Sequence, residues 1–138
     1  MKKLILTAAA LLLLAGTTFG QTLKKGGIIA ITTWEVTLKP DATMNQFLDI
    51  SKKWNSAYEK AYPGTKAFTL MGERGENKYK VSTLLYFEST ELRDKFWPTE
   101  DEEGPYDEAA SEFFAPIMEE GSKLIIDNKG ESTDWLIL

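Results

Sequence analysis

The apolar residues of this chain recur at two different spacings, and the order of these spacings limits the fold more than any other feature. Residues 28–39 are rich in Ile, Thr, Trp and Val, which is typical of a long β-strand. Its even-numbered residues share one face, and its odd-numbered residues, from Ile29 to Lys39, share the other. Pro40 ends the strand, because proline has no N–H to donate to a neighbouring strand.

Residues 44–62 predict an amphipathic helix. Thr43 is a helix-capping residue type, and Gln46 follows it at the three-residue spacing of a capping box. Apolar side chains then recur at steps of three and four residues and so share one face of the helix. These residues are Phe47, Ile50, Trp54, Tyr58 and Ala61. Pro63 and Gly64 end the helix.

Residues 66–71 and 79–88 predict the two strands of a hairpin, because a polar, glycine-bearing loop at 72–78 separates them. The second strand alternates, so that one of its faces carries Ser82, Leu84 and Tyr86. A brief helix over 90–97 follows, with Ser89 as its cap.

The last part of the chain predicts a second long helix over 106–127. Pro116 lies inside this helix and is expected to kink it or make it restart. Residues 128–130 end in glycine and predict the end of the helix. Residues 134–138 then predict a short final strand.

The resulting order is β-α-β-β-α-β. The simplest architecture for this order is an α+β fold, in which a four-stranded antiparallel sheet carries both helices on one face. The length is that of one domain, which we place at 21–138.

The first twenty residues predict a secretory signal peptide, residues 1–20. Lys2 and Lys3 precede an apolar run, and the small residues Thr18 and Gly20 favour cleavage before Gln21. The run is shorter than the ~20 apolar residues that a membrane-spanning helix needs. A lipoprotein requires a cysteine at the cleavage site, and this chain has none. The pattern is bacterial in style and predicts a soluble periplasmic or extracellular protein that is not a lipoprotein.

The charge balance limits the partners. The chain carries 16 basic and 21 acidic residues, a net charge of −5, and loss of Lys2 and Lys3 makes the mature protein more acidic. Nucleic acids bind through Lys and Arg contacts to phosphate, so this composition argues against a nucleic-acid partner. It equally argues against binding to anionic membranes after the signal is removed.

The absence of histidine and cysteine excludes several kinds of site. Ser-His-Asp and Cys-His nucleophiles cannot be built, nor can zinc sites made of Cys and His. Haem held by His or Cys is excluded as well. The acidic cluster Glu100–Glu103, with Asp107 and Glu108 nearby, carries oxygen ligands for Ca²⁺ but lacks the alternate-residue spacing of an EF-hand loop. A solvated acidic loop is favoured, and no cofactor or metal is expected.

Two stretches resemble the dimeric α+β barrel superfamily, the ferredoxin-like fold shared by antibiotic-biosynthesis-monooxygenase-like and stress-responsive barrel domains. One is Trp34–Pro40, which leads into the helix over 44–62, and the other is the strand Val81–Glu88 followed by Ser89–Phe96. The resemblance covers residues 26–138. Asp41 stands where the family usually has glycine.

The resemblance implies a homodimer whose two sheets face each other and enclose a pocket. The residues favour a dimer independently, because one predicted sheet face is half apolar: Ile29, Ile31, Thr33, Glu35, Ser82, Leu84 and Tyr86. An apolar patch of that kind, left in water, marks an interaction site, and a second copy could cover it. The alternative is that only the helices cover the sheet and that the other face is polar enough for water.

The candidate site residues lie on that same face. Glu35 lies mid-strand, where Thr33, Ser82 and Tyr86 could surround it and let it act as a general base. An exposed glutamate, or one paired with Lys80, is the simpler interpretation. We therefore take Thr33, Glu35, Ser82 and Tyr86 as candidate ligand-binding residues, with Glu35 as the only catalytic candidate.

Aromatic residues are a second candidate set, because cofactor-free oxygenases of the resembling family use aromatic and polar groups. The residues that could line such a pocket are Trp34, Trp54, Tyr79, Tyr86 and Trp97. Core packing is the favoured interpretation, since aromatic side chains bury the most area. The haem-degrading branch of the family uses a histidine ligand, which this chain lacks.

The leading hypothesis from the sequence is a secreted, dimeric domain, either non-catalytic or of unassigned role, that holds a small apolar or aromatic ligand between its sheet and its helices. The first alternative is a cofactor-free monooxygenase-like enzyme. The second is a module that binds another protein.

Overall fold

The computed structural model describes residues 23–98 and 108–138. The predicted signal peptide at 1–20, the acidic residues at 100–103 with Asp107, and the predicted helix start at Tyr106 lie outside the described residues. The elements are β1 (Ile28–Leu38), α2 (Met44–Ala61), β2 (Thr65–Met71), β3 (Val81–Phe87), α3 (Thr90–Phe96), α4 (Glu108–Ser122) and β4 (Ile125–Leu136).

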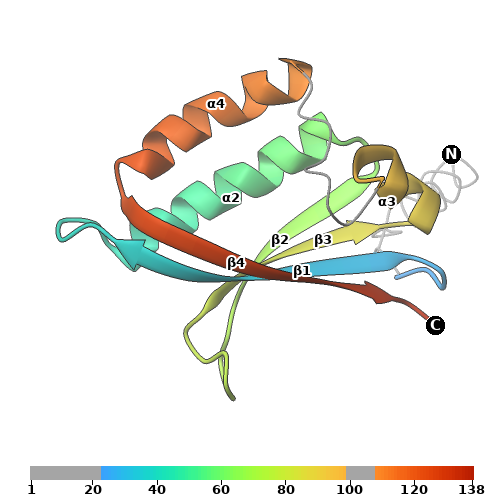
Figure 1. Cartoon of the computed structure of the whole chain (residues 1–138), viewed down its shortest axis with the longest axis horizontal. Coiled ribbons are helices and arrows are strands. Elements are labelled where there is room, and N and C mark those ends of the chain that lie inside the picture. The colour runs from blue at the N-terminus through green and yellow to red at the C-terminus, as the bar shows by residue number, and fades with distance from the viewer. Residues whose placement is uncertain (1–22, 99–107) are drawn as a thin grey trace, which may run out of the picture.

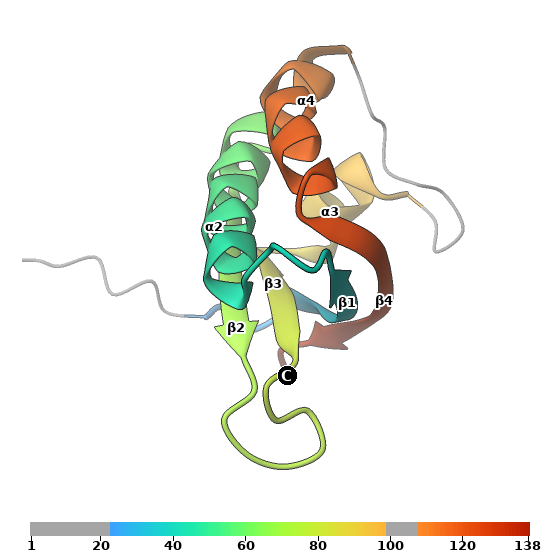
Figure 2. The same cartoon turned by 90° about the vertical axis from the view of Figure 1, so that its left-hand side faces the viewer.

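The four strands form one sheet in the order β2-β3-β1-β4, and every neighbouring pair is antiparallel. Helices α2 and α4 lie side by side over one face of this sheet (Figures 1 and 2). The predicted α+β class, the ferredoxin-like topology and the placement of the helices on one face are confirmed.

The strand register assigns each residue to one of two faces. Asn55 of α2 donates to the Thr69 hydroxyl at 2.9 Å, so the face of the sheet that carries Thr69 is the helix-side face. Residues that alternate with this set form the opposite face, which we call the open face. Its members are Lys66, Phe68 and Leu70 of β2, Ser82, Leu84 and Tyr86 of β3, Ile29, Ile31, Thr33, Glu35 and Thr37 of β1, and Asp127, Lys129, Glu131, Thr133 and Trp135 of β4.

Helix α2 begins and ends where the sequence predicts. The Thr43 hydroxyl accepts from the backbone N–H of Gln46, and the Gln46 side chain accepts from the backbone N–H of Thr43 at 2.8 Å. This capping box satisfies two N–H groups that have no partner within the helix. Helix α3 is also capped at its N-terminus, because the Ser89 hydroxyl accepts from the backbone N–H of Leu92.

Aromatic rings fill the space between the helices and the sheet. Phe114 of α4 is 1% exposed and stacks on Trp54 of α2, with ring centroids 4.7 Å apart. Tyr62 lies 4.9 Å from Phe96 and 4.8 Å from Trp97, measured between ring centroids. These rings occupy the region where the sequence predicted a ligand, so that space in the described part of the chain is packed core.

The predicted second long helix and final strand are both present, but the predicted boundary between them is wrong. Helix α4 ends at Ser122, and residues 125–136, half of which were expected to be helix or helix end, form the long strand β4. Two turn hydrogen bonds end the helix: Lys123 N–H donates to Glu120 and Leu124 N–H donates to Gly121. β4 then pairs with the whole length of β1, and this continuous ladder outweighs the helical spacing of the side chains. Pro116 lies within α4, which continues through it without restarting.

One glycine of β4 is required by the ring beside it. A Cβ on Gly130 would lie 2.6 Å from the Trp34 ring, and Trp34 is held in place because its Nε1–H donates to Thr83 at 3.0 Å. We expect Gly130→Ala to lower the free energy of unfolding by about 1–3 kcal/mol, because the ring must leave its position. Urea denaturation measures the loss. The control Lys129→Ala is expected to cost under ~0.5 kcal/mol at its exposed position, and equal costs for the two variants would contradict the steric explanation.

Candidate functional site

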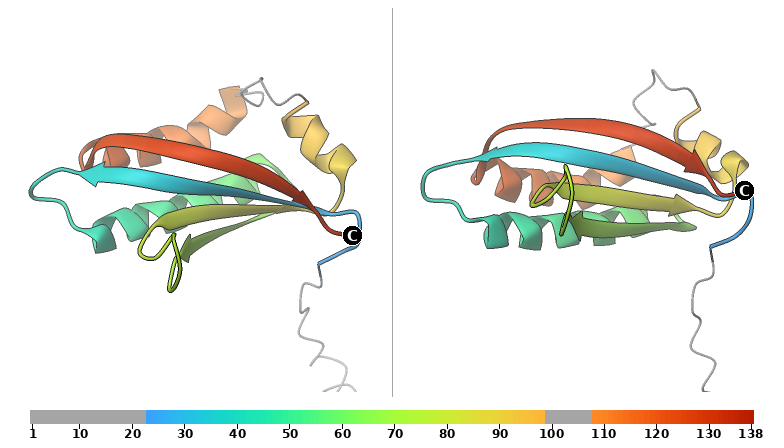
Figure 3. Two further views of the ribbon diagram at one scale, coloured as in Figure 1. Left: turned by 60° about the horizontal axis from the view of Figure 1, so that its bottom comes forward. Right: turned by 90° about the horizontal axis from the view of Figure 1, so that it is seen from below.

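No described helix covers the open face (Figure 3). Apart from Leu70, which lies opposite Ser82, its apolar residues occupy two neighbouring rows of the sheet. The register places Phe68, Leu84 and Ile31 in one row. The next row carries Ile29 and Trp135, whose side chain is 59% exposed. The open face is therefore mostly apolar at one end, where Lys66 and Thr133 are the polar members of the two rows.

The other end of the open face is polar. The hydroxyls of Thr33 and Ser82 lie 3.1 Å apart and share a hydrogen bond. Lys80 Nζ donates to Glu35 Oε1 at 3.4 Å, and the Glu35 side chain is mostly exposed. This pairing is the simpler of the two predictions made for Glu35. In this position Glu35 faces water and Lys80 rather than an enclosed substrate site.

Tyr86 lies on the open face but is covered by the chain just before β1. Only 2% of Tyr86 is exposed. The backbone N–H of Lys24 donates to the Tyr86 hydroxyl at 3.0 Å, and a Cβ on Gly27 would lie 3.0 Å from the ring. Lys24 is held by Glu88 at 2.5 Å, and the hydrogen bond with Glu88 raises the pKa of the Lys24 ammonium. In the single chain the Tyr86 ring is therefore packed against residues 24–27 and is not exposed on the open face.

The four candidate residues share a face, but only two of them meet. Tyr86 lies opposite Ile29, six residues from Glu35 along β1. At ~3.3 Å per residue this separation is about 20 Å. Thr33 and Ser82 are direct neighbours, so the structure gives one hydroxyl pair and leaves Glu35 and Tyr86 apart.

Sequence reasoning missed three large residues of the open face: Phe68, Leu70 and Trp135. The alternation within 66–71 could have placed the first two on one face. Their face becomes known only through the register with β3, in which Phe68 lies opposite Leu84. The sequence places Trp135 in the last strand but does not say on which face of the sheet its side chain lies. That face follows only from the pairing of β4 with β1.

The predicted aromatic set divides between core and surface. Trp54 and Trp97 belong to the packed rings, as the core interpretation predicted. Trp34 lies on the helix-side face over Gly130. Tyr79 lies outside both groups, in the loop between β2 and β3, where it is exposed.

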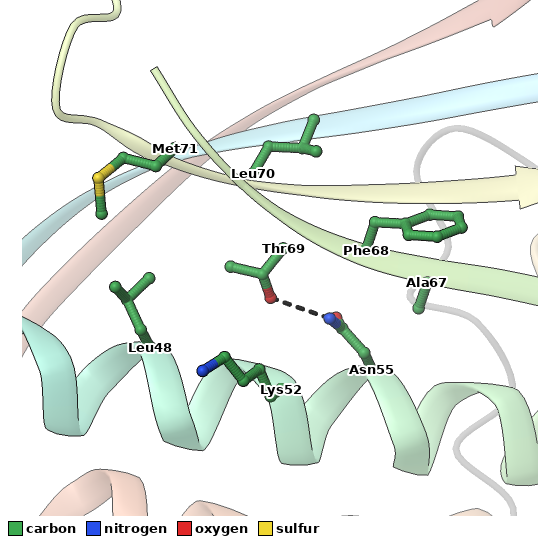
Figure 4. A pocket seen from close by; sticks show the side chains of 8 residues that line it. All are labelled: Leu48, Lys52, Asn55, Ala67, Phe68, Thr69, Leu70 and Met71. Atoms are coloured by element: carbon green, nitrogen blue, oxygen red, sulfur yellow. Dashed lines mark hydrogen bonds between the residues drawn. The ribbon is translucent and has the colours of Figure 1, made fainter. Parts of the chain in front are cut away.

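A shallow groove runs between α2 and the edge strand β2 (Figure 4). Its volume is about 370 Å³, and the Asn55–Thr69 hydrogen bond crosses it. A smaller groove of about 270 Å³ lies between α2 and α4, where Lys53 and Lys60 border Phe113. Both grooves open to solvent, and neither contains a candidate residue from the sequence.

Within residues 23–98 and 108–138, no cluster of three or more acidic side chains could hold a metal ion. In the same ranges no helix has the length and apolar character needed to cross a membrane.

No family model matches the sequence, and no curated protein matches it. Three solved structures are similar in fold. A dimeric, ferredoxin-like protein of unknown function from Bacteroides fragilis is 10% identical and matches over 80% of this chain and 98% of its own, with a TM-score of 0.40. SnoaB, a cofactor-independent oxygenase from Streptomyces nogalater, is 11% identical over 80% of this chain and 91% of its own, with a TM-score of 0.44.

The third structure is an uncharacterized NIPSNAP-like domain protein from Burkholderia xenovorans. It is 12% identical over 79% of this chain and 84% of its own, with a TM-score of 0.44. Similarity at this level carries neither an activity nor a set of site residues to this chain.

Proposed function

We propose that the mature protein, residues 21–138, is a secreted homodimer in which two open faces stack and hold a small apolar or aromatic ligand between them. The observation that carries the proposal is the apolar end of the open face, which no described helix covers. Phe68 and Trp135 are exposed there, beside the partly exposed Ile31 and Leu84, and the exposed Leu70 lies in the adjoining row opposite Ser82. Contiguous apolar surface of this kind on a soluble protein marks an interaction site.

A second copy suits this surface for a geometric reason. The open face is a twisted sheet, and two sheets pack face to face at about 10 Å by interdigitating the side chains of their inner faces. A two-fold axis brings the same face from each chain, so any contact between two different residues occurs twice, once in each direction. The interface therefore needs no element beyond the four strands.

The hydroxyl pair gives the proposed pocket its polar component. Small-molecule sites are mostly apolar with a few convergent polar groups that orient the ligand. Thr33 and Ser82 lie beside Ile31 and Leu84 in the sheet register, so apolar and hydroxyl groups meet at the middle of the open face. A ligand with an apolar body and one hydrogen-bonding group fits this composition.

The enzyme alternative has less support. A cofactor-free oxygenase needs a base that faces an enclosed substrate, and Glu35 is exposed and paired with Lys80. Tyr86 is covered by residues 24–27 and cannot approach Glu35. The protein-binding alternative uses the same open face and differs only in what covers it.

Light scattering during size-exclusion chromatography of residues 21–138, over a wide concentration range, tests the proposal. We expect twice the mass of one chain at micromolar concentration, and native mass spectrometry of protein purified from the exporting cell is expected to show a co-purified small molecule. The intact mass also tests secretion, since cleavage before Gln21 fixes the mass of the mature chain. A strict monomer without ligand would contradict the proposal.

A further inference from the structure

The loop between β2 and β3 is a closed and well-defined structure. Gly72 N–H donates to Lys80 at 3.0 Å, and Tyr79 N–H donates back to Gly72 at 2.8 Å. Within the loop, Lys78 N–H donates to Gly75 and Lys80 N–H donates to Asn77. The backbone packs so tightly that a Cβ on Gly72 would lie 1.8 Å from the Asn77 carbonyl oxygen. Only glycine fits this position.

Tyr79 occupies this loop at a conformational cost. Its φ is +69°, which makes it the one non-glycine residue with positive φ in the described part of the chain. Bulky side chains disfavour this left-handed region, and glycine or asparagine would occupy it more easily. Strain of this kind occurs where the residue serves a purpose that outweighs the cost.

The chain itself gains little from the Tyr79 ring. The side chain is 70% exposed. Its neighbour in the described residues is Lys78, whose Nζ lies 4.8 Å from the ring centroid. A strained backbone that presents an aromatic ring to water indicates that the partner of the ring lies outside the described residues.

The direction of the loop identifies the partner. The loop projects away from α2 and α4, on the side of the open face (Figures 1 and 2), and it rises toward the viewer when the open face is seen directly (Figure 3). A sheet stacked on the open face would therefore meet the loop at its rim.

We infer that the β2–β3 loop is a contact arm for a second copy of this chain, in which Tyr79 packs against the partner at the rim of the stacked open faces. The inference rests on the proposed homodimer and adds to it a contact outside the sheet. Tyrosine suits the position because it buries a large ring at low entropic cost and keeps a hydroxyl for a polar partner. The left-handed backbone sets the direction in which the ring points.

The test compares the dimer dissociation constant with the thermal stability of the chain for Tyr79→Gly. Glycine removes the ring and also relieves the backbone, so we expect the dissociation constant to rise about tenfold or more, while the midpoint of unfolding measured on dilute monomer stays the same or rises. Analytical ultracentrifugation measures the first quantity and circular dichroism the second. Tyr79→Phe keeps the ring and is expected to stay within about threefold of the wild type.

Phe113→Ala is the matched control, because Phe113 is an exposed aromatic residue of α4, on the far side of the sheet from the open face. It is expected to leave the dissociation constant unchanged. A dimeric wild type with an unchanged constant in Tyr79→Gly would overturn the contact arm and leave the homodimer standing. A lower midpoint of unfolding in Tyr79→Gly would show that the ring stabilises its own chain, which also overturns the arm. A wild type that is monomeric at every concentration overturns both.

Discussion

Replacement of Phe114 by alanine is expected to lower the free energy of unfolding by about 3–5 kcal/mol, a large loss for a single truncation. Phe114 is 1% exposed, and its ring stacks on Trp54 with centroids 4.7 Å apart. Its edge also meets Tyr58, at 5.2 Å between centroids. Alanine removes the transfer free energy of the ring and leaves a cavity that rigid aromatic neighbours cannot collapse to fill.

The adjacent Phe113→Ala is the matched control for stability. Both residues belong to α4, so the change in helix propensity is the same, but Phe113 is 40% exposed. We expect a loss of about 1 kcal/mol or less for Phe113→Ala. Urea denaturation followed by circular dichroism measures both variants. If the two losses were equal, the ring packing between α2 and α4 would not be the core that the contacts indicate.

Leu84→Lys is expected to convert the proposed dimer into a monomer. Leu84 lies in the middle of the open face, between Phe68 of β2 and Ile31 of β1. In the stacked dimer the lysine would bury an ammonium without a partner, which costs several kcal/mol. The dissociation constant should therefore rise at least ~100-fold, as each 1.4 kcal/mol corresponds to a factor of ten.

The isolated chain tolerates the same substitution. Leu84 is partly exposed on the open face, so the lysine stem can lie on the apolar surface while the ammonium reaches water. The unfolding midpoint of the monomer is expected to change little. Sedimentation velocity measures the association of Leu84→Lys and of the control Phe113→Lys. The control places the same charge on the helix side of the sheet, so a difference between the two variants reports on the open face alone. A dimer that persists unchanged in Leu84→Lys would show that the open face is not the interface.

The first two-thirds of the fold followed from the sequence because its signals are local. Helix α2 begins at the predicted Thr43–Gln46 capping box and ends just before Pro63 and Gly64, as predicted. The alternation in β1 correctly separated the two faces of the sheet, since the side-chain period of a strand is two. In these segments the local preference and the tertiary structure favour the same conformation.

Two segments behave differently because distant residues decide them. Ile125 continues the apolar spacing of α4, yet it begins β4 because β1 offers an unpaired edge along its whole length. Tyr79 continues the alternation of the strand that follows it, but closure of the loop onto Gly72 forces its backbone into the left-handed region. Neither the edge of β1 nor the closure of the loop can be read from a window of neighbouring residues.

The candidate site shows the same division. The sequence placed Thr33, Glu35, Ser82 and Tyr86 on one face of a sheet, and the register agrees. Their distances were not predictable, because the pairing of β1 with β3 determines that Thr33 meets Ser82 while Tyr86 lies opposite Ile29. The coverage of Tyr86 by Lys24 and Gly27 depends on the path of the chain before β1.

The sequence by itself determined the α+β class, the element order up to α3, the helices on one face and the lack of histidine and cysteine chemistry. These properties depend on composition and on periods of two and 3.6 residues, which act within one element. Only the tertiary structure decided the length of β4, the neighbours of each site residue and the direction of the Tyr79 loop. These features depend on hydrogen bonds and packing between elements that are far apart in the chain. Such contacts form only when the whole sheet has assembled.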